Sequence, residues 1–329
     1  PLVLSTTDKP TFASLGRVEA IRQLFEGSGY TPFEEPLWYK DKDGASYVNA
    51  SRIMLEGTDF NLEYFPLKHL GYKSVLAVTG ELYSVLAHPK ALSITLGVSA
   101  KLDFEQIREL WNGVLVAAKE HGYAKISLDL VPSRNGLAVS VNAFGCRLSG
   151  AESKPSEAKS KDLICVSGRL GAAYLGQQVL ERKPSELEKY KMMLGAYLKP
   201  DLDPDTVSDV ERSGIIPSYG YFVSRGLADA VLRLHRDSGM GVKLYADRIP
   251  FEGNSFSLGK ELDIDPLSAA MNGGDDFCLM YVISLSKYEE FKKFFNTFEA
   301  VGHLALPEVG AVLVTPDGLE HQVSAQGWL

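Results

Sequence analysis

The chain has 329 residues, of which 45% are hydrophobic, and a formal net charge of −8 at pH 7. This length and hydrophobic content are enough for two globular domains. The acidic balance argues against a general nucleic-acid or anionic-membrane binder, so we expect neither a nucleic-acid partner nor a membrane partner.

The first half of the chain contains a predicted strand–helix–hairpin unit. Residues 92–99 and 124–131 alternate apolar and polar side chains, as half-buried strands do. Between them, apolar residues from Phe104 to Ala118 recur at helical spacing, and residues 137–145 form a third predicted strand. Asp129 alternates with Leu128 and Leu130, so it is predicted to project from the other sheet face.

A polar, lysine-rich segment at 151–161 has no hydrophobic periodicity and is predicted to be a linker. Residues 162–180 then form a strand, a glycine turn and a helix, and residues 277–284 form a later strand. Alternating strands and helices predict an α/β or α+β fold. We therefore expect one domain at 1–150 and a second at 162–329.

Ser224-Arg225-Gly226 is predicted to be a turn between a strand and a helix. The strand includes residues 221–223, and the apolar residues of 227–234 fall on one face of a helix that ends at Gly239. Turns of this kind direct backbone N–H groups and side chains at an open sheet edge, where α/β proteins bind anions and metals. A permanent cation, Arg225, stands at that position.

A second turn, NGGDDFCLM, places Asp275 and Asp276 after two glycines and before a strand. Glycines allow a sharp turn, and paired carboxylates there can ligate a hard cation or a polar ligand. The alternative is a tight turn with solvated aspartates.

Other familiar site signatures are absent. There is no Gly-x4-Gly-Lys-Ser/Thr loop, and SGRLGAAYLG lacks the glycine spacing of a dinucleotide fingerprint. The six histidines are not spaced as zinc ligands are.

The three cysteines, Cys146, Cys165 and Cys278, lie in apolar runs and are expected to be reduced, buried thiols. The start of the chain lacks a basic region followed by an apolar block, and we expect a cytoplasmic protein.

Several stretches resemble the thiamine-monophosphate kinase family, part of the aminoimidazole ribonucleotide synthetase-like superfamily. They include IMLEGTDFNLEYFPLKHLGYKSV, AHPKALSITLGVS, DLICVSGRLGAAYLG, IPSYGYFVSRGL, MNGGDDFCLMY and the terminal AQGWL. The resemblance implies a two-domain fold, with an N-terminal α/β domain that forms a homodimer through its sheet and a C-terminal α/β domain. It also implies an active site between the domains, where aspartates hold Mg²⁺, ATP and the substrate phosphate.

This chain departs from the family pattern at the first set of ligand positions. Pro32 and Phe33 align with a family aspartate pair, although a shift of one or two residues would bring Glu34 and Glu35 there. Arg52 aligns with a family aspartate, and Asp59 with a family histidine.

Two family aspartate positions in the first half of the chain still carry an acidic residue. Glu81 aligns with the aspartate of Asn-Leu-Ser-Asp, and Asp129 with that of Gly-Gly-Asp-Thr, although the glycines before it are Ser127 and Leu128. If any metal is bound, Glu81 and Asp129 are the predicted metal ligands.

The second half of the chain also contains both replaced and retained family residues. Arg225 replaces the aspartate of Ser-Asp-Gly-Leu, and Pro155 replaces the arginine that opens the family linker. Other family positions are kept or conservatively changed: Gly273, Gly274, Asp275, Asp276 and Trp328. Cys278 replaces a carboxylate.

Two roles are open for the arginines. Arg52 and Arg225 could pair with Asp129, Glu81 or Asp276 and so replace a metal charge. Alternatively, they could bind a phosphorylated or carboxylated ligand directly through forked hydrogen bonds. Arginine remains protonated and repels a divalent cation, so we expect no two-metal site and no bound cofactor.

The resulting prediction is a degenerate homologue of the kinases, without metal-dependent catalysis and with no catalytic residue assigned. The predicted ligand-binding residues are Arg52, Asp59, Arg225, Gly273, Gly274, Asp275, Asp276 and Trp328. The predicted ligand is a phosphorylated small molecule. The alternatives are an active thiamine-phosphate kinase that uses Mg²⁺ and ATP, and a scaffold protein with the cleft filled by Phe33.

Overall fold

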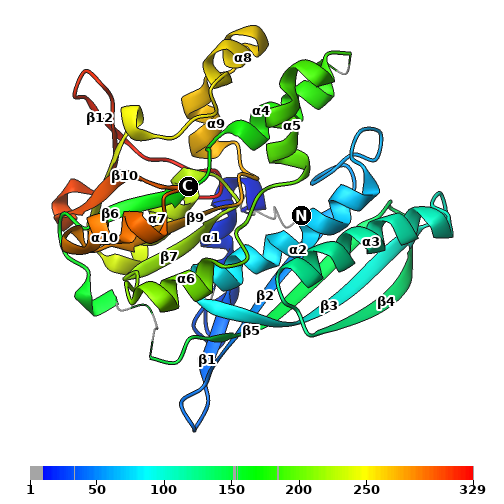
Figure 1. The fold of residues 1–329 in the computed structure, drawn as a ribbon, viewed down its shortest axis with the longest axis horizontal. Helices are drawn as coiled ribbons and strands as arrows, with labels where there is room; N and C mark the ends of the chain where they lie inside the picture. Colours follow the sequence, from blue (N-terminus) through cyan, green and yellow to red (C-terminus); the bar gives the residue numbers. More distant parts are fainter. Residues whose placement is uncertain (1–9, 33, 151–152, 154, 184, 329) are drawn as a thin grey trace, which may run out of the picture.

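The computed structural model describes residues 10–32, 34–150, 153, 155–183 and 185–328. Two β-sheets and the helices that cover them form a mixed α/β fold, which confirms the predicted fold class (Figure 1). The N-terminal sheet is formed by residues 37–147 and the C-terminal sheet by residues 163–322. The predicted boundaries at 150 and 162 fall between the two sheets and remain a prediction.

The N-terminal sheet has the strand order β1-β2-β5-β3-β4. Its strands are β1 (Leu37–Lys40), β2 (Ser46–Leu55), β3 (Ala87–Ser99), β4 (Lys125–Ser133) and β5 (Ala138–Arg147). β3 and β4 are parallel because α3 (Phe104–Glu120) crosses between them, and the other neighbours are antiparallel. α3 begins at a capping box in which Asp103 accepts from the backbone N–H of Gln106 at 2.9 Å.

One face of the N-terminal sheet is covered by α2 (Leu67–Ser84) and α3, as Figure 1 shows. The covered face is apolar, with fully buried Leu96 on β3 and Val139 on β5. The opposite face carries exposed side chains of β2 and β5, among them Ile53 and Phe144. We call this second surface the open sheet face.

The C-terminal sheet has the order β12-β11-β8-β10-β6-β9-β7. Its strands are β6 (Leu163–Ser167), β7 (Tyr219–Val223), β8 (Gly241–Tyr245), β9 (Cys278–Ile283), β10 (Phe298–Ala305), β11 (Ala311–Val314) and β12 (Glu320–Gln322). The helices of this half are α4 (Ala172–Arg182), α5 (Lys191–Leu198), α6 (Thr206–Ser213), α7 (Leu227–Ser238), α8 (Ser255–Leu262), α9 (Pro266–Asn272) and α10 (Tyr288–Phe294). The predicted helix after Gly226 is α7, and Gly239 ends it in a left-handed conformation with φ 64°.

α2 connects the two sheets through one continuous core. Its buried side chains belong to a hydrophobic cluster that also contains Phe222 of β7 and Tyr281 of β9. A Cβ atom on Gly80 of α2 would lie 2.1 Å from the Phe222 ring, and one on Gly220 would lie 2.1 Å from the Ser84 carbonyl oxygen. These glycines therefore allow α2 to lie directly against the second sheet.

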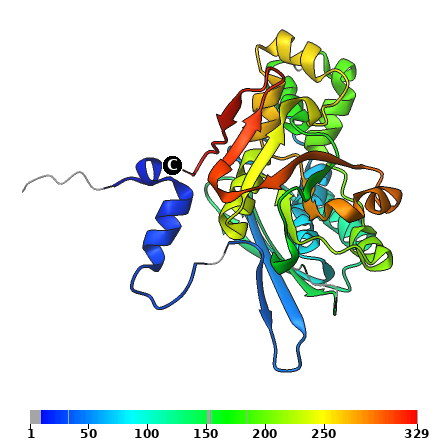
Figure 2. The same ribbon diagram turned by 90° about the vertical axis from the view of Figure 1, so that its left-hand side faces the viewer.

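α1 (Phe12–Phe25) lies apart from both sheets, beside the C-terminal segment (Figure 2). The N–H of Val18 donates to the Gly327 carbonyl at 3.0 Å, and Arg17 donates to Asp229 of α7 at 3.1 Å. Only Gly16 and Ala20 of this helix are buried. α1 is thus held mainly by polar contacts at its N-terminal half.

Cys146, Cys165 and Cys278 are free thiols on strands, with Cys165 and Cys278 buried and Cys146 half-buried. Phe33, which was expected to fill the cleft, lies outside the described residues. Among the described residues, no helix combines the length and apolar character needed to cross a membrane.

Candidate functional site

A cavity of about 850 Å³ lies where α1, α4 and the loops of both halves meet. We call it the arginine cavity. Its lining includes five of the predicted ligand-binding residues: Asp59, Arg225, Gly273, Gly274 and Asp275. The remaining wall comes mainly from α1 and from the C-terminal residues Gln326 and Gly327. The structure therefore brings these five predicted residues together around one cavity.

The two turns singled out in the sequence are hydrogen-bonded to each other. The N–H of Asp275 donates to the Ser224 carbonyl at 2.9 Å. Gly226 adopts φ 94°, and a Cβ atom there would lie 2.3 Å from the Met271 carbonyl oxygen. Glycine is needed at this position because both the backbone angle and the space exclude a side chain. Arg225 is thereby held at a fixed place on the cavity wall.

Arg225 has an exposed side chain that makes no hydrogen bond or ion pair with any residue the structure describes. Surrounding protein atoms, followed by the nearby cations Arg17 and Arg52, lower its pKa. An arginine stays charged despite such a shift, because its pKa in water is far above neutrality. The arginine cavity therefore contains a guanidinium group whose donors are not used by any described residue.

The carboxylate of Asp275 forms an ion pair with Lys73, a residue that the sequence analysis missed. Lys73 of α2 is fully buried, and its Nζ lies 2.9 Å from Oδ2 of Asp275. The same ammonium group lies 3.9 Å from the ring centroid of Tyr197 and 5.5 Å from those of Phe65 and Phe277. Burial lowers the pKa of Lys73, whereas Asp275 opposes that change.

Arg52 does not have the partners expected for it. Its Nη2 lies 3.7 Å from Oδ1 of Asp59, and no described contact joins it to Asp129, Glu81 or Asp276. Asp59 also accepts from the N–H of Leu55 at 2.8 Å. Among the described residues, neither Arg52 nor Arg225 forms an ion pair with Asp129, Glu81 or Asp276, although both favour the charged form of Glu81.

Glu81 and Asp129 lie on opposite sides of the N-terminal sheet. Glu81 is buried on α2, which covers one sheet face. Asp129 is exposed on β4 and pairs in register with Thr95, so it points to the open sheet face, as the strand alternation predicted. The two predicted metal ligands of one chain therefore cannot share a metal ion.

Glu81 instead faces cations. Burial raises its pKa to about 7, and the nearby Arg233, Arg225 and Arg52 favour its charged form. Its Oε2 atom is buried and has no hydrogen-bond partner among the described residues.

Within the same described part of the chain, no three His, Cys, Asp or Glu side chains are arranged to hold a metal ion. These residues do not fit the magnesium cluster that the resemblance implies.

Two further predicted ligand-binding residues have other contacts. Asp276 is buried and accepts from the N–H groups of Gly171 at 2.9 Å and Ala173 at 3.3 Å, so it caps α4. Burial raises the pKa of Asp276 to about 7 although these N–H groups favour the carboxylate. Trp328 donates through Nε1 to Asp229 at 2.8 Å. Neither side chain lines the arginine cavity.

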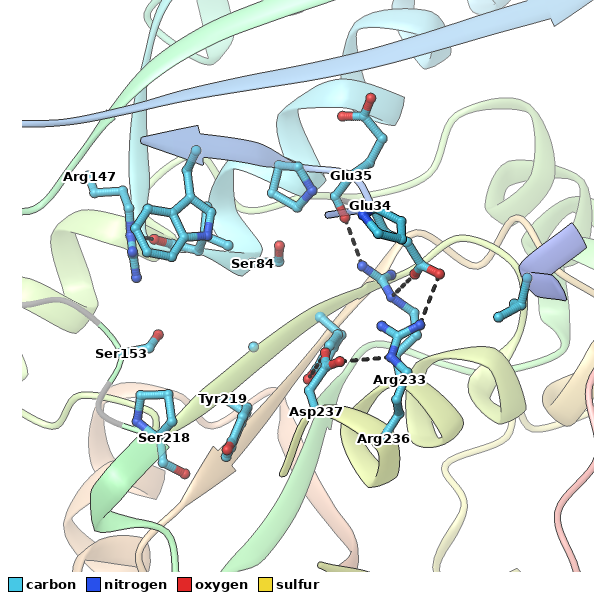
Figure 3. A pocket seen from close by; sticks show the side chains of 18 of the residues that line it. Glu34, Glu35, Ser84, Arg147, Ser153, Ser218, Tyr219, Arg233, Arg236 and Asp237 are labelled. Atoms are coloured by element: carbon cyan, nitrogen blue, oxygen red, sulfur yellow. Dashed lines mark hydrogen bonds and ion pairs between the residues drawn. The ribbon is translucent and has the colours of Figure 1, made fainter. Parts of the chain in front are cut away.

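A second cavity, of about 720 Å³, lies on the other side of α1 and is shown in Figure 3. We call it the tryptophan cavity, after Trp38 of β1. Ile21 of α1 lines both cavities. Pro32, Glu34 and Glu35 line the tryptophan cavity. Glu34, which with Glu35 aligns with the family aspartate pair if the alignment is shifted, forms an ion pair with Arg236 at 2.9 Å.

No family model matches the chain. Among curated proteins, the thiamine-monophosphate kinase of Bacillus subtilis (strain 168) is 23% identical over 85% of this chain and 84% of its own length. The enzyme of Rhodopirellula baltica is 24% identical over 74% of this chain and 70% of its own length. The chain is a distant homologue of the thiamine-monophosphate kinase family.

Solved structures agree with this kinase-like fold. AaThiL complexed with AMPPCP and TMP superposes with a TM-score of 0.83 at 18% identity and covers 98% of this chain and 99% of that one. A HypE–HypF complex superposes with a TM-score of 0.67 at 17% identity, covering 92% of this chain and 98% of that one. The match over nearly the whole length shows that this chain shares the two-sheet fold of those structures.

Proposed function

We propose that this kinase homologue binds a phosphorylated small molecule in the arginine cavity without a metal ion and without phosphoryl transfer. The observation that carries the proposal is Arg225, a cation exposed in the cavity with no described partner. Forked N–H donors of arginine match the oxygen atoms of a phosphate group. A cavity of about 850 Å³ is within the range of small-molecule sites.

The charge balance of the cavity supports an anionic ligand. Both carboxylates of its wall are near cations, since Asp275 is paired with Lys73 and Asp59 lies 3.7 Å from Arg52. Arg17, the other arginine of the wall, is paired with Asp229. Arg225 therefore supplies a positive charge that no carboxylate of the described residues contacts.

Metal independence is supported by the surroundings of Glu81. The carboxylate faces three arginines, and a divalent cation placed beside them would be repelled. Asp129 is separated from Glu81 by the sheet. Catalysis of the kind implied by the resemblance depends on metal ions that neutralise the transferring phosphate.

Isothermal titration calorimetry tests this function. The purified chain is titrated with thiamine monophosphate, AMPPCP and inorganic pyrophosphate, first with Mg²⁺ and then with chelator. We expect at least one of the three to bind equally well in both conditions. Arg225→Ala should weaken that binding about tenfold or more, because it removes charged hydrogen bonds. Arg108→Ala, on the outer side of α3, is the matched control.

The outcomes separate the alternatives. Binding that requires Mg²⁺, together with phosphate transfer from ATP to thiamine monophosphate, would contradict the proposal and indicate an active kinase that uses Glu81 or Asp129. Absence of binding in either condition would also contradict it and leave the scaffold alternative. Binding unaffected by Arg225→Ala would show that Arg225 is not the anion site.

We further propose that the chain forms a homodimer through the open sheet face. That face exposes a group of large apolar side chains: Leu37, Tyr39, Tyr47, Ile53, Leu55, Val131 and Phe144. Exposed apolar surface of this kind commonly marks a protein interface. The resemblance to dimeric kinases implies the same surface.

A further inference from the structure

The tryptophan cavity is enclosed by elements of both halves of the chain. Its lining comes from β1, the C-terminal end of α2, the end of β5, β7 and α7, with α1 on one side. Figure 3 shows Arg147, Ser84 and Tyr219 around the cavity and the charged residues of α7 at its edge. Its exposed wall is mostly apolar. This composition is typical of a site for an organic molecule rather than for an inorganic anion.

The charged residues at the edge of the cavity are paired with each other. Glu34 lies 2.9 Å from Nη1 of Arg236 and 3.3 Å from Nε of Arg233. Arg233 also donates to the Glu35 carbonyl at 2.8 Å, and Arg236 donates to Asp237 at 2.9 Å. Their positive charges are therefore balanced within the protein, unlike that of Arg225.

The other cations of the wall are also occupied. Arg147 donates through Nε to the Val85 carbonyl at 3.0 Å, and its guanidinium lies 4.8 Å from the Trp38 ring centroid. Arg22 is paired with Glu19 and Glu26. Lys40 has an interaction partner as well. A phosphate or carboxylate that entered this cavity would have to displace one of these contacts.

Aromatic side chains remain available. The guanidinium of Arg147 covers one face of the Trp38 ring and fixes its orientation, while 38% of Trp38 is exposed. The Tyr219 hydroxyl makes no hydrogen bond with any described residue. Burial, followed by the nearby Asp237, raises the Tyr219 pKa, so the hydroxyl keeps its proton and can donate it in a hydrogen bond.

We propose that the tryptophan cavity is a second binding site, which takes a flat, uncharged aromatic molecule that stacks on Trp38 and accepts a hydrogen bond from Tyr219. The site is separate from the arginine cavity and does not depend on the function proposed for it. Aromatic stacking supplies the affinity, and the Tyr219 hydroxyl favours ligands with a ring acceptor.

Saturation-transfer NMR with quinoline as the probe tests this site. Quinoline is flat, uncharged at neutral pH and has one ring nitrogen that accepts a hydrogen bond. We expect saturation transfer to quinoline, with an affinity that falls about tenfold in Trp38→Ala because the stacking contact is lost. Tyr219→Phe, which keeps the ring but removes the hydroxyl, should weaken binding about fivefold. Both residues are only partly buried, so both variants should fold, which circular dichroism checks.

Two control variants locate the effect. Phe256→Ala removes an exposed aromatic side chain on α8, outside both cavities, and should leave quinoline binding unchanged. Arg225→Ala should also leave it unchanged, and an excess of pyrophosphate should not displace quinoline. Trp38→Ala should in turn leave anion binding in the arginine cavity unchanged.

Three results would overturn the inference. The first is absence of saturation transfer to quinoline at millimolar concentration from the folded protein. The second is equal binding by the native chain, Trp38→Ala and Tyr219→Phe. The third is displacement of quinoline by pyrophosphate, which would show that one anionic site accounts for both ligands.

Discussion

Lys73 and Asp275, which are 202 positions apart in the sequence, form an ion pair that joins α2 to the acidic turn of the second half. The two ends of the pair differ in exposure, since the Lys73 side chain is fully buried and 28% of the Asp275 side chain is exposed. The cost of breaking the pair should therefore depend on which partner is removed.

Asp275→Asn should be the more damaging substitution. It leaves a buried ammonium group without its counter-charge, which costs about 3–5 kcal/mol of unfolding free energy. Lys73→Met leaves a carboxylate that solvent reaches, and we expect a loss of about 1–2 kcal/mol. Urea unfolding of both variants measures the difference, with Lys68→Met on the exposed side of α2 as the control. Equal losses for the two variants would contradict the asymmetry.

Glu81→Gln should change how stability depends on pH. The pKa of Glu81 is raised from 4.5 in the unfolded chain to about 7 in the folded one. Between these values the unfolded chain releases the proton while the folded chain keeps it, so stability falls as pH rises through this window. The full effect is at most about 3 kcal/mol.

The variant removes this dependence. Unfolding free energies measured at pH about 5 and about 8 should differ less in Glu81→Gln than in the native chain, with the variant the more stable of the two at the higher pH. Glu109→Gln, on the exposed side of α3, should keep the native dependence. An unchanged dependence in Glu81→Gln would show that Glu81 is ionised in the folded protein well below pH 7.

Asp276→Ala should destabilise the start of α4. The substitution leaves the N–H groups of Gly171 and Ala173 without their acceptor, at a cost of about 1–2 kcal/mol. Asp276→Asn keeps one acceptor oxygen and should lose less. Hydrogen exchange of the first turn of α4 provides a local measurement, and Asp43→Ala in the exposed β1–β2 hairpin provides a neutral control. Protection of that turn equal to the native value in Asp276→Ala would rule out the capping role.

Phe144→Glu should separate the proposed homodimer. Phe144 is 46% exposed on the open sheet face, between Asn49 of β2 and Ala91 of β3. A carboxylate at this place would lose its water in the interface, which is unfavourable for a charge. Sedimentation velocity should give a dimer for the native chain and for Phe256→Glu, and a monomer for Phe144→Glu. A monomeric native chain would contradict the dimer proposal directly.

Local patterns predicted some of these features correctly. Strand alternation predicted the direction of Asp129, and the apolar spacing after Gly226 predicted α7 and its end at Gly239. These features depend on residues close in the sequence, so the period of the pattern is sufficient to find them. The resemblance added the overall fold, because whole motifs rather than single residues matched.

The missed features depend on contacts between distant segments. Lys73 looks like an ordinary helix residue until Tyr197 and Asp275 are placed around it. Asp276 was expected in the site beside Asp275, but its carboxylate caps α4. Neighbouring residues in a tight turn point in different directions, and only the backbone angles of the turn decide which one reaches the cavity. The pairing of Arg52 could not be predicted for the same reason.

The position of α2 between the sheets also determines how the chain can be divided. A chain cut in the linker would expose the surface of α2 around Gly80 on one fragment and Phe222 of β7 on the other. Each fragment would then expose a large apolar surface to water, and neither fragment would fold on its own. The two halves should therefore unfold together in a single cooperative transition.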